Sequence, residues 1–324
     1  MIAIPAIALA AGAASALMFA SIISGALISL PLLYLAPLPL MVAALGWGPL
    51  AATIGGIAAA LSVGALFGVA HCVDFALTVA LPAWWLGHLV LLGRATDTAS
   101  NGAAPASPVL EWYPIGRILL WIAVLSVMTT MAALLMLGSD AEAINSALRE
   151  LFQQLVHNIP VQDGDATANF DRFIDRLTKI TPAIVAFAAM TRLILNLWLA
   201  AKITQTSGRL QRPWPDLRSI ALPPMTLVAF CVAVAFCFVG GLLGMVARVV
   251  TAALLIDYAL IGFAVLHTVT LSLNGRAFWL ACAYSAVLLF GGLLLPVALL
   301  GLADAVFGFR QRYLRGRPPP LPAS

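Results

Sequence analysis

Residues 6–30 read AIALAAGAASALMFASIISGALISL and contain no formally charged side chain. A helix needs about 20 apolar residues to cross the hydrocarbon core of a bilayer, so this run is long enough for one crossing. A secretory signal would begin with basic residues and end after roughly 7–15 apolar ones. No base precedes this run, and it stays apolar as far as Leu30. We therefore predict an uncleaved first membrane span.

The composition of the whole chain extends this interpretation. Hydrophobic residues make up 62% of the 324 residues and charged residues only 9%, against about 45–50% and about 25% in soluble domains. So few charges cannot cover a wetted surface, which excludes a soluble globular enzyme, and so much apolar surface excludes intrinsic disorder. We predict an all-α, polytopic integral membrane bundle of about 8–9 transmembrane helices.

The apolar runs and the loops between them give the predicted organisation. The second run carries three prolines, which remove helix donors, so we expect that span to be kinked or partly re-entrant. The expected segments are a four-span bundle at 1–93 (spans 6–30, 31–47, 50–70 and 73–93), a cytoplasmic loop at 94–113, a fifth span at 114–138, an extracytoplasmic insert at 139–181, a sixth span at 182–201, a basic cytoplasmic loop at 202–222, C-terminal spans at 223–303 (223–243, 248–273 and 277–300) and a basic tail at 304–324.

The hydrophilic insert carries a helical pattern. From Ala141 to His157 the apolar residues recur at helical spacing, with Ser139 or Asp140 as the expected cap. A second short helix is predicted from Asn169 to Ile180. We expect the pair to lie as an amphipathic hairpin on the membrane surface, with a lid or a partner-binding element as the alternative.

Lysine and arginine in short loops set the predicted orientation. Segment 202–222 has four bases and one acid, whereas the insert 139–181 has seven acids and four bases. This places the N-terminus in the cytoplasm, but three further spans would then leave the arginine-rich tail outside. Either the run 277–300 is split near Gly291–Gly292 or Pro296, or one of the two preceding runs does not cross fully. We favour a cytoplasmic tail.

Ionisable side chains inside predicted spans are candidate ligand-binding residues, because burying them is costly. Arg192 lies about ten residues into the sixth span, and Asn196 follows one turn later. Asp257 lies at similar depth in the eighth span, so it is a possible partner of Arg192. His267 comes ten residues after Asp257. The alternatives are a structural ion pair or a water-filled crevice, with His267 as an interfacial histidine.

No sequence motif points to catalysis or to a bound cofactor. Walker, GxGxxG, GxSxG and HExxH patterns are absent, so we do not expect an enzyme. The cysteines form no CxxC motif, and neither a metal site nor a cofactor is expected. The bases lie in short loops rather than on one face, which argues against nucleic acid as a partner.

Scattered segments resemble the YybS-like family of uncharacterised bacterial membrane proteins, itself similar to the substrate-capture (S) subunits of energy-coupling-factor transporters. They are Gly25-Ala-Leu-Ile, the Pro31–Pro39 region, Gly46-Trp-Gly-Pro, Gly55-Gly56, Leu210–Pro223, Gly262-Phe-Ala-Val-Leu-His267, Gly301-Leu-Ala-Asp304 and Arg310. The resemblance implies a multi-pass protein of the bacterial inner membrane with a small-molecule pocket between helices. It also implies a docking face at Ala6, Ala10 and Ala14 for an energy-coupling transmembrane subunit. The chain departs from S subunits in having about three extra spans and an acidic insert.

Two functions follow as hypotheses. The first is a transporter-type small-molecule-binding subunit without its own ATPase, whose partners are membrane lipid and a coupling subunit with ATPases, or a second copy of the chain. The second is a structural or regulatory membrane protein that binds other proteins through its insert and tail.

Overall fold

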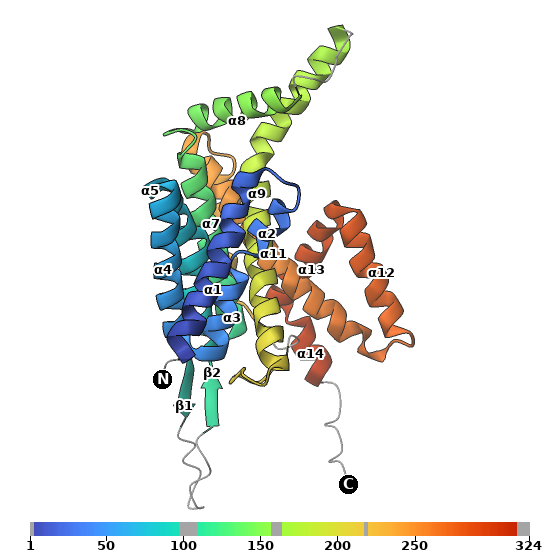
Figure 1. Ribbon diagram of the computed structural model, residues 1–324. Helices are drawn as coiled ribbons and strands as arrows, with labels where there is room; N and C mark the ends of the chain where they lie inside the picture. The colour runs from blue at the N-terminus through green and yellow to red at the C-terminus, as the bar shows by residue number, and fades with distance from the viewer. Residues whose placement is uncertain (1–2, 97–108, 157–163, 217–219, 316–324) are drawn as a thin grey trace, which may run out of the picture. The chain divides into compact units, whose positions relative to one another are not determined.

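The computed structural model describes residues 3–96, 109–156, 164–216 and 220–315, and these are almost entirely helical (Figure 1). The chain divides into two compact units. Unit 1 comprises residues 1–129 and 188–215, and unit 2 comprises residues 130–187 and 216–324. Seven described helices or helix pairs are long and apolar enough to cross a membrane, or eight if one sharply bent pair is a single span. The predicted all-α polytopic fold is confirmed.

Unit 1 contains most of the predicted N-terminal spans. Its elements are α1 (Ala3–Ala20), η1 (Ser21–Ser24), α2 (Ser29–Leu35), α3 (Leu38–Trp47), α4 (Pro49–Phe67), α5 (Val69–Phe75), a π-helical turn η2 (Ala76–Ala80), α6 (Leu81–Leu91), β1 (Gly93–Thr96), β2 (Val109–Trp112), most of α7 (Ile115–Leu135) and the end of α9 (Gly164–Thr206).

Glycines let the first helices of unit 1 pack and turn tightly. A Cβ at Gly12 of α1 would overlap the carbonyl oxygen of Gly55 in α4, so the two backbones touch there. Gly48 and Gly68 have φ of 95° and 96° and separate successive helices without any longer loop. The predicted kink of the second span is present as the break between α2 and α3, just before Leu38.

The loop expected at 94–113 begins and ends as a β-ribbon. β1 and β2 pair antiparallel, with Gly93 opposite Trp112 and Thr96 opposite Val109. Arg212 fastens this ribbon to α6, because its Nη1 donates to the carbonyl of Val90 at 3.3 Å and its Nη2 to that of Tyr113 at 2.9 Å. The middle of the predicted loop, 97–108, lies outside the described residues.

Unit 2 begins with the hydrophilic insert. Helix α8 (Ala141–Val156) has the predicted cap, since Asp140 Oδ1 accepts hydrogen bonds from the backbone N–H groups of Glu142 and Ala143, both at 2.9 Å. The predicted separation of a short helix 169–180 from a span 182–201 is wrong. Both belong to the single 43-residue helix α9, with Pro182 inside it. A proline removes one backbone hydrogen bond, and the intact turns on both sides keep the helix continuous.

The rest of unit 2 explains the conflict over the C-terminal tail. The predicted span 223–243 forms only the 12-residue helix α10 (Met225–Phe236), about 18 Å long at about 1.5 Å per residue. Helix α11 (Gly241–Val269) is long enough to cross a membrane, and the short 3-10 helix η4 (Thr270–Ser272) follows it. The predicted ninth span is two helices, α12 (Arg276–Leu289) and α13 (Leu294–Phe307), bent by 120° around η5 (Gly291–Leu293).

The break falls at the glycine pair named from the sequence. If the bent pair is one span, two crossings follow residue 222 and the tail returns to the cytoplasm, whereas a re-entrant pair leaves one crossing. The cytoplasmic tail stays a prediction. Helix α14 (Phe309–Arg315) ends the described chain. Arg310, which lies in the predicted basic tail, is 9% exposed and packs within unit 2.

Candidate functional site

The four predicted ligand-binding residues do not form one site within either unit. Arg192 and Asn196 lie in the part of α9 that belongs to unit 1, whereas Asp257 and His267 lie in α11 of unit 2. The predicted pairing of Arg192 with Asp257 joins two different units, so it stays a prediction.

Arg192 ties α9 to an irregular part of the fourth span. Its Nη2 donates to the carbonyl oxygen of Thr78 at 3.0 Å. Thr78 lies in the π-helical turn, and Pro82 four residues later has no N–H to donate back to that carbonyl. The guanidinium therefore supplies a hydrogen bond that the helix itself cannot make. Arg192 Nε is buried without a partner among the described residues.

Asn196 makes a second tie one turn further along α9. Its Nδ2 donates to the carbonyls of Tyr34 at 2.9 Å and of Arg192 at 2.7 Å, and the side chain is fully buried. Together the two side chains attach α9 to α2 and to the fourth span. Arg192 and Asn196 therefore make structural contacts with backbone carbonyls inside unit 1, and the ion pair considered from the sequence stays a prediction.

We expect the stability lost on removing the Arg192–Thr78 hydrogen bond to depend on Pro82. Arg192→Met should destabilise the protein by about 1–3 kcal/mol, because the Thr78 carbonyl loses its donor in an apolar setting. In a Pro82→Ala background the new backbone N–H reaches that carbonyl, so the same change should cost clearly less. Thermal unfolding of the four variants in detergent measures the difference, with exposed Arg176→Met as the control. Equal costs in both backgrounds would contradict this role.

Asp257 and His267 have different surroundings in unit 2. Asp257 is fully buried, and neither carboxylate oxygen has a hydrogen-bond partner among the described residues. His267 is bonded at the corner between α11 and α12, with its Nε2 2.8 Å from Tyr284 Oη and its Nδ1 3.4 Å from Arg276 Nη2. His267 therefore has structural partners, whereas Asp257 does not.

The predicted docking face of α1 is not the face that packs inside unit 1. Ala6 and Ala10 are exposed and Ala14 is half-buried. The buried face of α1 instead contains Ala8 and Phe19. The alanine face remains open for contact with lipid or with another protein.

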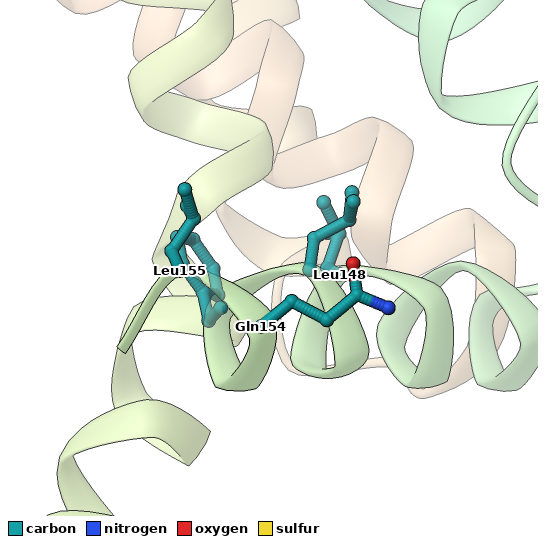
Figure 2. Close-up of a pocket in the computed structure, with 5 residues that line it drawn as sticks. Leu148, Gln154 and Leu155 are labelled. Carbon is teal, nitrogen blue, oxygen red and sulfur yellow. The ribbon is translucent and has the colours of Figure 1, made fainter. Parts of the chain in front are cut away.

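A shallow apolar pocket of about 390 Å³ lies on α8 (Figure 2). Its lining residues all come from that helix, and Leu148 and Leu155 project toward the same side. Leu155 is 77% exposed. Gln154 is the polar side chain of the lining, so this surface offers shape and apolar area but few groups that would orient a small molecule.

A larger cavity, of about 730 Å³, lies entirely within unit 2. Its size falls within the range of ligand pockets, about 300–1,000 Å³. It is bounded by the segment before α10, the start of α10, the middle of α11, the end of α13, and α14. The described lining residues are Ile220, Ala221, Leu222, Pro223, Pro224, Thr226, Leu227, Tyr258, Ile261, Asp304, Ala305, Val306, Phe307, Gly308, Arg310, Gln311 and Arg312.

Two polar pairs are built into the walls of this cavity. The hydroxyls of Thr226 and Tyr258 are 3.1 Å apart. Asp304 accepts two bonds from Arg310, one from Nε at 2.7 Å and one from the backbone N–H at 2.8 Å. Both side chains of this ion pair are almost buried, at 4% and 10% exposure. The pair therefore fixes the corner between α13 and α14 and holds α14 against the cavity.

These lining residues were not predicted as a site. Tyr258 follows the predicted residue Asp257, but one residue turns the side chain by about 100° around a helix. The segments 210–223 and 301–304 and Arg310 were singled out only because they carry the family resemblance. Several of those residues meet at this cavity, and this coincidence is the signal that the sequence offered.

Comparison with protein families matches residues 13–305 to the family described as Predicted membrane protein (DUF2232). Comparisons with curated proteins and with solved structures return no match. The family match spans most of the chain and agrees with the apolar helices of both units. The chain therefore belongs to this DUF2232 family of predicted membrane proteins.

Proposed function

We propose that the protein is a transporter-type, small-molecule-binding membrane subunit without an ATPase of its own, and that it binds rather than catalyses. The observation that carries the proposal is the cavity of unit 2, which combines ligand-like size with a lining of both apolar and polar groups. The binding residues in this proposal are Thr226, Tyr258, Arg310 and Arg312, in place of the predicted set around Arg192.

The assembly proposed for this subunit rests on the sequence. The resemblance to S subunits supports a coupling subunit with ATPases as the partner, docked on Ala6, Ala10 and Ala14. The exposure of Ala6 and Ala10 is compatible with this. The charge of the loops supports an inner-membrane location with the N-terminus and the tail in the cytoplasm.

The test is native mass spectrometry of the full chain, extracted gently from its own membrane. We expect one bound small molecule per chain, and we expect it to be lost in Ala305→Trp. Ala305 is an exposed residue of the cavity wall, so the larger side chain fills the space without removing a polar group. The same spectra report bound coupling or ATPase subunits.

The matched control is Ala281→Trp, the same change on an exposed position of α12 away from the cavity. It should keep the ligand. A wild-type protein without any ligand, or equal ligand occupancy in both tryptophan variants, would contradict the proposal.

A structural or regulatory role through protein contacts is the second candidate. It is favoured by α8, whose Leu151 and Leu155 are exposed beside the shallow pocket (Figure 2). Arg149 on the same helix pairs with Asp175 of α9 at 2.9 Å, which holds the insert in place. Spectra that show a non-transport protein partner and an empty cavity would favour this role.

A further inference from the structure

The positive charges that line the unit 2 cavity outnumber the negative ones. Asp304 and Arg310 neutralise each other in their buried ion pair. Arg312 also lines the cavity, is exposed, and has no ion-pair partner among the described residues. The α14 wall therefore presents one uncompensated guanidinium to whatever enters the cavity.

Apolar side chains line much of the rest of the cavity, beside the hydroxyl pair of Thr226 and Tyr258. The apolar lining residues include Pro224, Leu227, Ile261 and Phe307. Phe307 is 53% exposed, and Met225, which follows the lining residue Pro224 in the chain, is 75% exposed. Exposed apolar surface of this kind suits contact with lipid tails. The cavity therefore adjoins exposed apolar side chains.

A guanidinium beside exposed apolar side chains matches a particular ligand chemistry. Arginine binds phosphate through charge-assisted and frequently bidentate hydrogen bonds. Basic pockets between membrane helices recognise anionic lipid headgroups. An uncharged metabolite would not use the Arg312 charge, and a small hydrophilic anion would not use the apolar lining residues.

We propose that the unit 2 cavity binds a phosphate-bearing anionic amphiphile, of the phospholipid type, with the phosphate at Arg312 and the hydrocarbon along Leu227 and Phe307. This rests on the proposed function and names its substrate class. Gln311, also in the lining, is an additional donor for the headgroup. The ligand enters sideways from the bilayer, so its chains need not fit inside the cavity.

The test places the full chain in nanodiscs of phosphatidylcholine, with or without phosphatidylglycerol, and counts retained lipid by native mass spectrometry. We expect the wild type to retain one phosphatidylglycerol. Arg312→Gln should weaken that binding about tenfold or more, since a hydrogen bond to a charged group is lost. Arg176→Gln removes the same charge from an exposed position of α9 outside the cavity and should have no effect.

A third arm adds inorganic phosphate to phosphatidylcholine discs and measures protection against thermal unfolding. Protection by phosphate without retention of phosphatidylglycerol would assign the anion to a soluble source and overturn the lipid assignment. Equal retention in Arg312→Gln and Arg176→Gln would also overturn it. If the wild type carries a different ligand that Ala305→Trp loses, the proposed function stands and only this inference fails.

Discussion

Replacing Gly301 by valine is expected to destabilise unit 2 strongly. A Cβ at this position of α13 would overlap the carbonyl oxygen of Tyr258 in α11 and would lie 2.8 Å from the backbone nitrogen of Gly262. Gly262 is placed in the same way against the carbonyl of Val297. Small residues permit such close approach between membrane helices. Valine would force α13 away from α11.

We expect the free energy of unfolding to fall by about 3 kcal/mol or more, at the upper end of overpacking effects. The fall is large because backbone rather than a flexible side chain must move. Denaturant titration of the purified protein in detergent measures the loss. Gly291→Val is the matched control, since nothing lies within 4 Å of the Cβ position at Gly291. The ligand should be lost as well, because Tyr258 lines the cavity. Equal stability of the two valine variants would show that the helices are not in contact there.

The second large effect is expected at the buried ion pair. Asp304→Ala should cost about 3–5 kcal/mol, because it leaves the Arg310 guanidinium buried without its carboxylate. The same change also removes the acceptor for the backbone N–H of Arg310. Thermal unfolding in detergent measures the effect. The matched control is Asp175→Ala, whose ion pair with Arg149 is about half exposed, and for which we expect at most about 1 kcal/mol.

A double variant separates the pair from its two members. Asp304→Ala combined with Arg310→Ala removes both charges, so no unpaired charge stays buried. Its cost should be clearly smaller than the sum of the two single costs. Strictly additive costs would mean that the two side chains do not stabilise each other, and that α14 is held by other contacts.

The sequence predicted how far along a span each ionisable residue lies better than it predicted which way its side chain faces around the helix. Arg192 and Asp257 were identified as ionisable residues within spans, and both lie in long apolar helices. Their partners depend on which way each helix faces, and hydrophobicity all around a membrane helix contains little of that information. Hence Thr78 and Pro82 around Arg192, and Tyr258 rather than Asp257 at the cavity, could not be predicted.

Local signals predicted the ends of elements well where a side chain acts on its own neighbours. Asp140 caps α8 as expected, and the glycine pair at 291–292 marks the break between α12 and α13. Arg310 shows the opposite case. It lies in the predicted basic tail, and its pairing with Asp304 was not predicted. Asp304, six residues earlier, meets it because Gly308 ends α13 with φ of 65° and turns the chain.

The most direct test of the account is a cryo-electron microscopy map of the full chain in discs made from its native lipids. The account predicts separate density in the unit 2 cavity, with a head beside Arg312 and an apolar part along Leu227 and Phe307. The Asp304–Arg310 ion pair should be visible in the cavity wall, where α13 meets α14. A cavity closed by its own side chains, or one filled only with water while Arg312 points into solvent, would contradict it.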